Sequence, residues 1–128
     1  GITGAQAIAL SVFLLRNGAS KDELKERIGK VYDLSLNVDE IRRINHYNET
    51  CQITVPQAIR SFIDSTSFED AIRNAISIDG DSDTIAAMTG SLAEAYYGVP
   101  EDLKRKAERF LPDDMRVILD QFYNRYGI

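Results

Sequence analysis

Helix-start signals recur along this chain, and no stretch shows the alternation of apolar and polar residues that a half-buried strand requires. Three pairs of polar residues have the spacing of a capping box or a close relative of it: Ser20 with Glu23, Asn37 with Glu40, and Ser67 with Asp70. Three prolines stand where prolines of a first helical turn occur, at Pro56, Pro100 and Pro112. We therefore expect an all-α fold, a compact multi-helix bundle.

These signals predict eight helices joined by short connections. We expect the helices over residues 3–17, 20–32, 38–46, 55–64, 67–77, 84–97, 100–110 and 112–125. Gly18 and Gly98 are well placed to end two of them. The chain has no internal repeat, no low-complexity tract and no long linker, so residues 1–128 are expected to form a single α-helical unit.

The first expected helix is apolar around most of its circumference. Its apolar residues are Ala5, Ile8, Leu10, Val12, Phe13, Leu14 and Leu15. Such a helix needs cover on every side, which predicts either a neighbouring segment outside this sequence or self-association. The segment is too short to span a bilayer and lacks the basic region and cleavage site of a signal peptide, so we expect no membrane interaction.

Charge and cysteine content narrow the partners and the compartment. The formal net charge is −5 and the charges are mixed, which argues against a nucleic-acid-binding surface because phosphate recognition needs clustered Lys and Arg. The basic cluster at residues 104–109 has the spacing of a solvated helix face. The single cysteine, Cys51, cannot form an internal disulfide, and this favours a cytoplasmic location.

The segment Ser77–Ala87 carries three carboxylates and several hydroxyls between two helical patterns. Unit charges about 6 Å apart at an effective dielectric of about 20 repel by roughly 3 kcal/mol per pair. A helix N-terminus offsets only about 0.3–1 kcal/mol for each carboxylate. If the carboxylates of Asp79, Asp81 and Asp83 converge, a bound cation or a raised pKa is needed.

Hard oxygen ligands of this type suit Mg²⁺ or Ca²⁺. The spacing of the three aspartates is that of the opening of an EF-hand loop, but Thr84 and Gly90 stand where that loop needs its glycine and its bidentate glutamate. What is left is a short cluster that leads into a helix. We predict that Asp81, Asp83 and Thr84 are metal ligands.

Residues 71–101 resemble the C-terminal signature of the ADP-ribosylglycohydrolase family. That signature has the form GlyGlyAsp, Ser or Thr, then AspThr, followed by AlaAla and a helix of small residues. The resemblance extends to residues 4–7, 51–58 and 111–114 and so covers nearly the whole chain. The chain in turn corresponds to only the later half of the family domain, and the fold implied is the helical fold of that family.

The resemblance implies two Mg²⁺ ions, of which Asp81, Asp83 and Thr84 hold one half of the site. The other ligand trio has no counterpart near this N-terminus. The implied reaction is hydrolysis of the N- or O-glycosidic bond between ADP-ribose and a modified side chain, with ADP-ribose or an ADP-ribosylated protein as partner. We expect this chain alone to be inactive, because the implied acid or base and half of the ligands would come from the N-terminal half of the domain.

Two departures from the family pattern keep other functions open. Asp79 stands where the family has a glycine, and Ile53 stands where a glycine is common. One alternative is a non-catalytic ADP-ribose-binding or regulatory relative. The other is a helical interaction module, in which Asp79, Asp81 and Asp83 would point apart into water.

Overall fold

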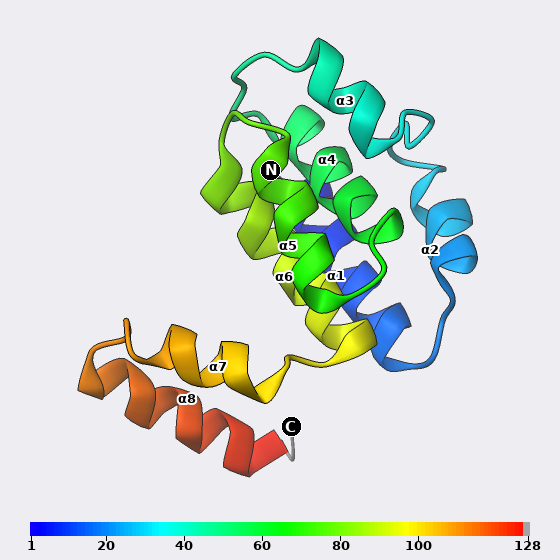
Figure 1. Ribbon diagram of the computed structural model, residues 1–128. Coiled ribbons are helices and arrows are strands. Elements are labelled where there is room, and N and C mark those ends of the chain that lie inside the picture. The colour runs from blue at the N-terminus through cyan, green and yellow to red at the C-terminus, as the bar shows by residue number, and fades with distance from the viewer. Residues whose placement is uncertain (127–128) are drawn as a thin grey trace. The chain divides into compact units, whose positions relative to one another are not determined.

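The structure is a computed structural model that describes residues 1–126. These residues form eight α-helices and no strand, which confirms the predicted all-α fold (Figure 1). The helices are α1 (Ile2–Arg16), α2 (Lys21–Ile28), α3 (Val38–Ile44), α4 (Cys51–Ile63), α5 (Phe68–Ser77), α6 (Ser82–Tyr97), α7 (Glu101–Glu108) and α8 (Asp113–Tyr126).

Local capping chemistry determines where several helices begin. Before α2, the side chain of Ser20 accepts a hydrogen bond from the backbone N–H of Glu23 (3.2 Å), and the Glu23 carboxylate accepts one from the backbone N–H of Ser20 (2.7 Å). Asn37 and Glu40 form a second complete capping box before α3. Ser67 caps α5 in a simpler way, by accepting a backbone N–H. Each bond satisfies a donor that the first helical turn leaves free.

The predicted start of the fourth helix, at a first-turn proline, is wrong. The helix begins at Cys51, and the backbone N–H of Thr54 already donates to the carbonyl of Thr50 (2.9 Å). Pro56 lies inside α4. Proline lacks an N–H, so it cannot donate to the carbonyl of Gln52, but this close to the helix start only one bond is lost.

The helices group into two compact units, Gly1–Gly98 and a second unit that starts at Val99. In the first unit α5 packs along α6, α4 packs against both, and α1 lies against α4 and α6 (Figure 1). The larger side chains of the core lie on these helices and on α2; they include Leu24, Ile28, Ile59, Phe62, Ile85 and Leu92. The second unit is the pair α7 and α8, in which no residue is buried. Whether the chain forms a single domain stays a prediction.

One face of α1 is buried, and the opposite face is not. The buried residues are Gly4, Ala7, Ser11 and Leu15, which recur at helical spacing. Ile2 and Phe13 are 79% and 63% exposed. That a partner covers the exposed apolar face of α1, whether a further segment or a second copy of the chain, remains a prediction.

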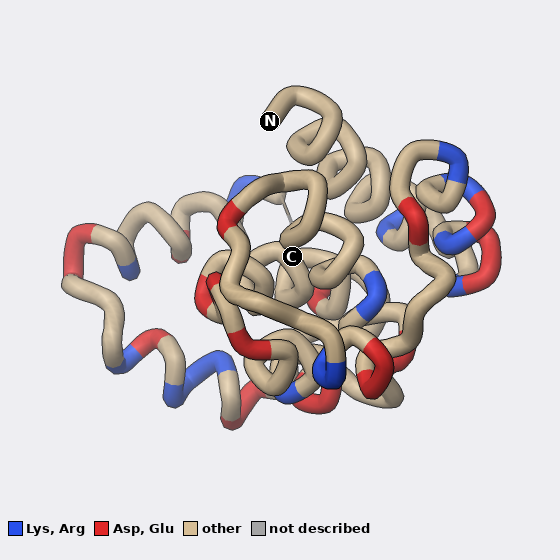
Figure 2. Tube along the Cα trace, turned by 90° about the horizontal axis from the view of Figure 1, so that it is seen from above, with Lys and Arg blue, Asp and Glu red and all other residues tan. Residues whose placement is uncertain are grey.

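Basic and acidic residues are interspersed along the chain (Figure 2). Within residues 1–126 there is no helix long and apolar enough to cross a membrane.

Candidate functional site

The loop between α5 and α6 makes a sharp turn through two residues with left-handed backbone angles. Asp79 has φ 72° and Gly80 has φ 84°. The Asp79 carboxylate accepts a hydrogen bond from the backbone N–H of Gly80 (2.8 Å), so this side chain serves its own loop. Because aspartate tolerates the left-handed region better than most residues, Asp79 adopts a conformation that glycine favours.

Asp81 and Asp83 meet at the start of α6. Asp81 is the N-cap residue, but its side chain accepts no capping hydrogen bond. Its carboxyl instead lies within hydrogen-bonding reach of the carboxyl of Asp83, and this contact lowers the pKa of Asp83. The backbone N–H of Thr84, which donates to the Asp83 carboxylate at 2.9 Å, lowers that pKa further. Asp83 is therefore ionised at neutral pH.

The structure brings together the carboxyls of two of the three predicted ligands, and the third ligand, Thr84, is next in the chain. Thr84 follows Asp83 in the exposed first turn of α6. The three aspartates do not converge: within the described residues 1–126, no group of three or more His, Cys, Asp or Glu side chains is placed to hold a metal ion. The available donor set is two carboxylates and one hydroxyl, all of them hard oxygens, and such a set fits Mg²⁺.

Asn45, just after α3, holds in place the loop between α5 and α6, which we call the acidic loop because it carries Asp79 and Asp81. Sequence analysis missed this role of Asn45. Its side-chain NH₂ group donates to the carbonyl of Ile78 at 3.0 Å and lies 3.4 Å from that of Asp79. Its carbonyl oxygen accepts a bond of 2.7 Å from the side chain of Gln57, which is 7% exposed. Asn45 and Ile78 are 33 residues apart. Local sequence patterns cannot predict a hydrogen bond between two loops that are this far apart in the chain.

The segment after Asn45 adds negative charge to the same corner. The hydroxyl of Tyr47 donates a hydrogen bond to the carboxylate of Glu49. That bond raises the pKa of Tyr47, as does the negative charge of Glu49, with smaller effects from the charges of Asp81 and Asp83. The two loops therefore present an acidic corner that attracts cations.

Comparison with known proteins identifies the class to which this fold and acidic loop belong. The family model described as ADP-ribosylglycohydrolase matches residues 1–127, and the chain belongs to that family. The chain is also similar to the mouse (Mus musculus) protein ADP-ribosylhydrolase ARH3, with 49% identity over 43 residues. That match covers 31% of this chain and only 12% of the mouse protein. No solved structure matches the chain significantly.

Proposed function

We propose that this protein supplies Asp81, Asp83 and Thr84 to a Mg²⁺ site of an ADP-ribosylglycohydrolase-type hydrolase. The complete enzyme would cleave the glycosidic bond between ADP-ribose and a modified side chain. Family membership supports the reaction type. The observation that carries the metal assignment is the carboxyl of Asp81, which stands at a helix N-cap, caps nothing, and meets the carboxyl of Asp83.

The donor set is chemically suited to the ion. Mg²⁺ takes about six oxygen ligands and usually keeps several waters, so two carboxylates and one hydroxyl provide half of a coordination shell. A divalent cation beside two carboxyl groups favours their charged forms, so an ion bound here would replace the direct contact between them. Asn45 holds the backbone of the loop between α5 and α6 by its hydrogen bond to the carbonyl of Ile78. The position of Asp81 at the start of α6 therefore does not require a bound ion.

The residues of this chain would hold and orient rather than transfer protons. When bound, Mg²⁺ would stabilise developing charge, orient ribose hydroxyls and activate a water molecule. The lowered pKa of Asp83 keeps its carboxylate charged, and the backbone N–H of Thr84 fixes its direction. By family resemblance, we expect the site to hold a second Mg²⁺. We expect the residues of the other ligand trio, and any general acid or base, to belong to a part of the domain outside these 128 residues.

Calorimetry with Mg²⁺ tests the metal assignment directly. The half shell predicts millimolar affinity for the full 128-residue chain. Asp81→Asn and Asp83→Asn should each weaken binding by about tenfold or more, whereas Ser82→Ala, a change between the two ligands, should leave it within about twofold. Micromolar affinity that is unchanged in Asp81→Asn would contradict the assignment. Circular dichroism confirms that each variant is folded.

Release of ADP-ribose tests the reaction. The chain is mixed with the N-terminal half of an ADP-ribosylglycohydrolase domain, and an ADP-ribosylated protein is supplied as substrate. We expect turnover that requires Mg²⁺ and is lost in Asp83→Asn. If no mixture is active, with Asp79→Gly included, while ADP-ribose still raises the melting temperature, the protein is a binding or regulatory relative instead of a hydrolase.

A further inference from the structure

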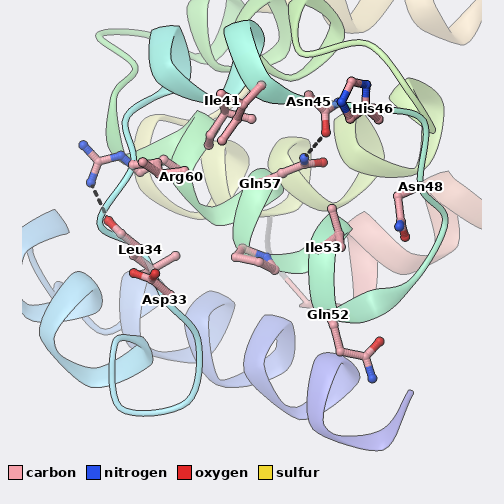
Figure 3. Close-up of a pocket in the computed structure, with 13 residues that line it drawn as sticks. Asp33, Leu34, Ile41, Asn45, His46, Asn48, Gln52, Ile53, Gln57 and Arg60 are labelled. Carbon is pink, nitrogen blue, oxygen red and sulfur yellow. Dashed lines mark hydrogen bonds between the residues drawn. The ribbon is translucent and has the colours of Figure 1, made fainter.

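A cavity of about 410 Å³ lies between the segment before α3, α3 itself and α4 in the first unit (Figure 3). The surface of its walls is more apolar than polar, and the aliphatic residues that line it include Leu34, Ile41, Ile53 and Pro56. Polar side chains line it as well: Gln52, Gln57 and Arg60 from α4, and Asp33, Asn45, His46 and Asn48 from the segments before and after α3. Asp81, Asp83 and Thr84 do not line it, so this cavity is distinct from the proposed metal site.

The amide of Gln57 presents a free acceptor to this cavity. The NH₂ group of Asn45 donates to the carbonyl of Ile78, so the side-chain oxygen of Asn45 faces Gln57. An oxygen can only accept, so Gln57 donates to it from its own NH₂ group. The carbonyl oxygen of Gln57 accepts no hydrogen bond from residues 1–126. No fully enclosed side-chain polar atom in that range lacks a partner. This oxygen therefore opens onto the cavity that Gln57 lines, although the residue is 7% exposed.

The cation in the wall is already neutralised. The guanidinium of Arg60 donates from Nε to Asp64 at 3.0 Å, and its Nη2 forms an ion pair with the same carboxylate at 2.7 Å. Its Nη1 donates to the carbonyl of Leu34 at 3.2 Å, as Figure 3 shows. A phosphate or carboxylate would compete with Asp64 for this group, and the carboxylate of Asp33 also lines the cavity, so the cavity disfavours an anionic ligand.

We propose that this cavity is a binding site for a small, neutral, planar molecule that carries an N–H donor, such as an aromatic carboxamide or a lactam. Its volume falls within the range of about 300–1,000 Å³ that is usual for small-molecule sites. The aliphatic part of the walls covers a flat ring, and an N–H of the ligand donates to the carbonyl oxygen of Gln57. Leaving that acceptor unpaired under an apolar ligand costs free energy, and this selects for the donor.

Titration of the full chain with three matched probes, followed by ¹H–¹⁵N NMR, tests the site. Benzamide should produce saturable shifts at the backbone amides of Ile41, Ile53 and Gln57, with a Kd of about 1 mM, as is typical of a fragment. N,N-dimethylbenzamide keeps the ring and carbonyl but has no N–H, and benzoate adds a charge. Each should bind about tenfold more weakly or not at all.

Two variants separate the site from its surroundings. Gln57→Leu should abolish the preference for benzamide over the dimethyl compound. Because that change also leaves the side-chain oxygen of Asn45 without a donor, Ile53→Trp provides a second route: it fills the cavity from its rim and should weaken benzamide binding by about tenfold. Ile76→Trp, at an isoleucine of α5 that is 56% exposed and does not line the cavity, is the matched control and should have no effect.

Three outcomes would overturn the proposal. The first is equal binding of benzamide and the dimethyl compound, and the second is no shift at the solubility limit of benzamide. The third is a set of shifts at the same amides when the protein is diluted without ligand, because these would show that another copy of the chain occupies the cavity.

Discussion

The hydrogen bonds of Asn45 predict the cost of replacing that residue with alanine. Two bonds have good geometry, to the carbonyl of Ile78 at 3.0 Å and from Gln57 at 2.7 Å, and the contact with Asp79 at 3.4 Å is too long to add much. Each good bond contributes about 0.5–1.5 kcal/mol net. The NH₂ group of Gln57, now unpaired, adds about 1 kcal/mol, because water can reach it through the cavity. Asn45→Ala should therefore cost about 2–4 kcal/mol.

Urea denaturation of the full chain, followed by far-UV circular dichroism, measures this cost, and the slope m should not change. Asn17→Ala is the control: it removes one exposed bond of 2.7 Å to the carbonyl of Phe13 and should cost about 1 kcal/mol or less. In a double-mutant cycle, Asn45→Ala and Gln57→Leu should couple by about 1 kcal/mol. A loss below about 0.5 kcal/mol, or strict additivity, would refute the idea that Asn45 holds the acidic loop through this network.

Three further changes test other parts of the fold. The ammonium group of Lys21 donates to the carbonyls of Ile63 and Ser65, and it lies 5.0, 5.7 and 5.2 Å from the ring centroids of Phe62, Tyr96 and Tyr97. Lys21→Met should therefore lower the free energy of unfolding, measured in urea, by about 1–3 kcal/mol, whereas Lys25→Met, at an exposed lysine, should be near neutral. Asp79→Ala should lower the unfolding free energy by about 1 kcal/mol because of its positive φ, whereas Asp79→Gly should stay within about 0.5 kcal/mol. The bond from the backbone of Ser20 lowers the pKa of Glu23, so its contribution is present above the ordinary carboxyl pKa and is lost as pH falls through the lowered value. Subtracting the pH profile of Glu23→Gln from that of the wild type should isolate this loss, and parallel profiles would exclude it.

Helix positions could be predicted here because the signals that set them are local. The capping boxes at Ser20 and Asn37 act within four residues, and both form as expected. The same local reasoning failed at Pro56, because a proline in the second turn of a helix removes one hydrogen bond, and that loss does not prevent the helix from beginning upstream. The helix begins upstream at Cys51, after a turn in which the side chain of Asn48 accepts a bond of 2.8 Å from the backbone N–H of Thr50.

The parts of the site that sequence could not provide depend on residues that are distant along the chain. The bond between Gln57 and Asn45 joins two segments 12 residues apart, and the bond from Asn45 to Ile78 joins two segments 33 residues apart. Neither residue belongs to a periodic pattern that indicates its partner. The cavity has the same origin, because its lining combines α3 and the segments before and after it with one face of α4.

Sequence also cannot distinguish an aspartate that caps a helix from one that is free to bind an ion, because both stand just before the first turn. The difference lies in which atoms the carboxylate faces. Asp81 occupies the N-cap but accepts no bond from the first-turn N–H groups, which stabilise a nearby negative charge through the helix dipole alone. Asp83 accepts the N–H of Thr84 and keeps a lowered pKa. The same helix end therefore reduces the cost of placing two carboxyls in contact without capping by the Asp81 side chain, and this is the basis for proposing Asp81 as a cation ligand.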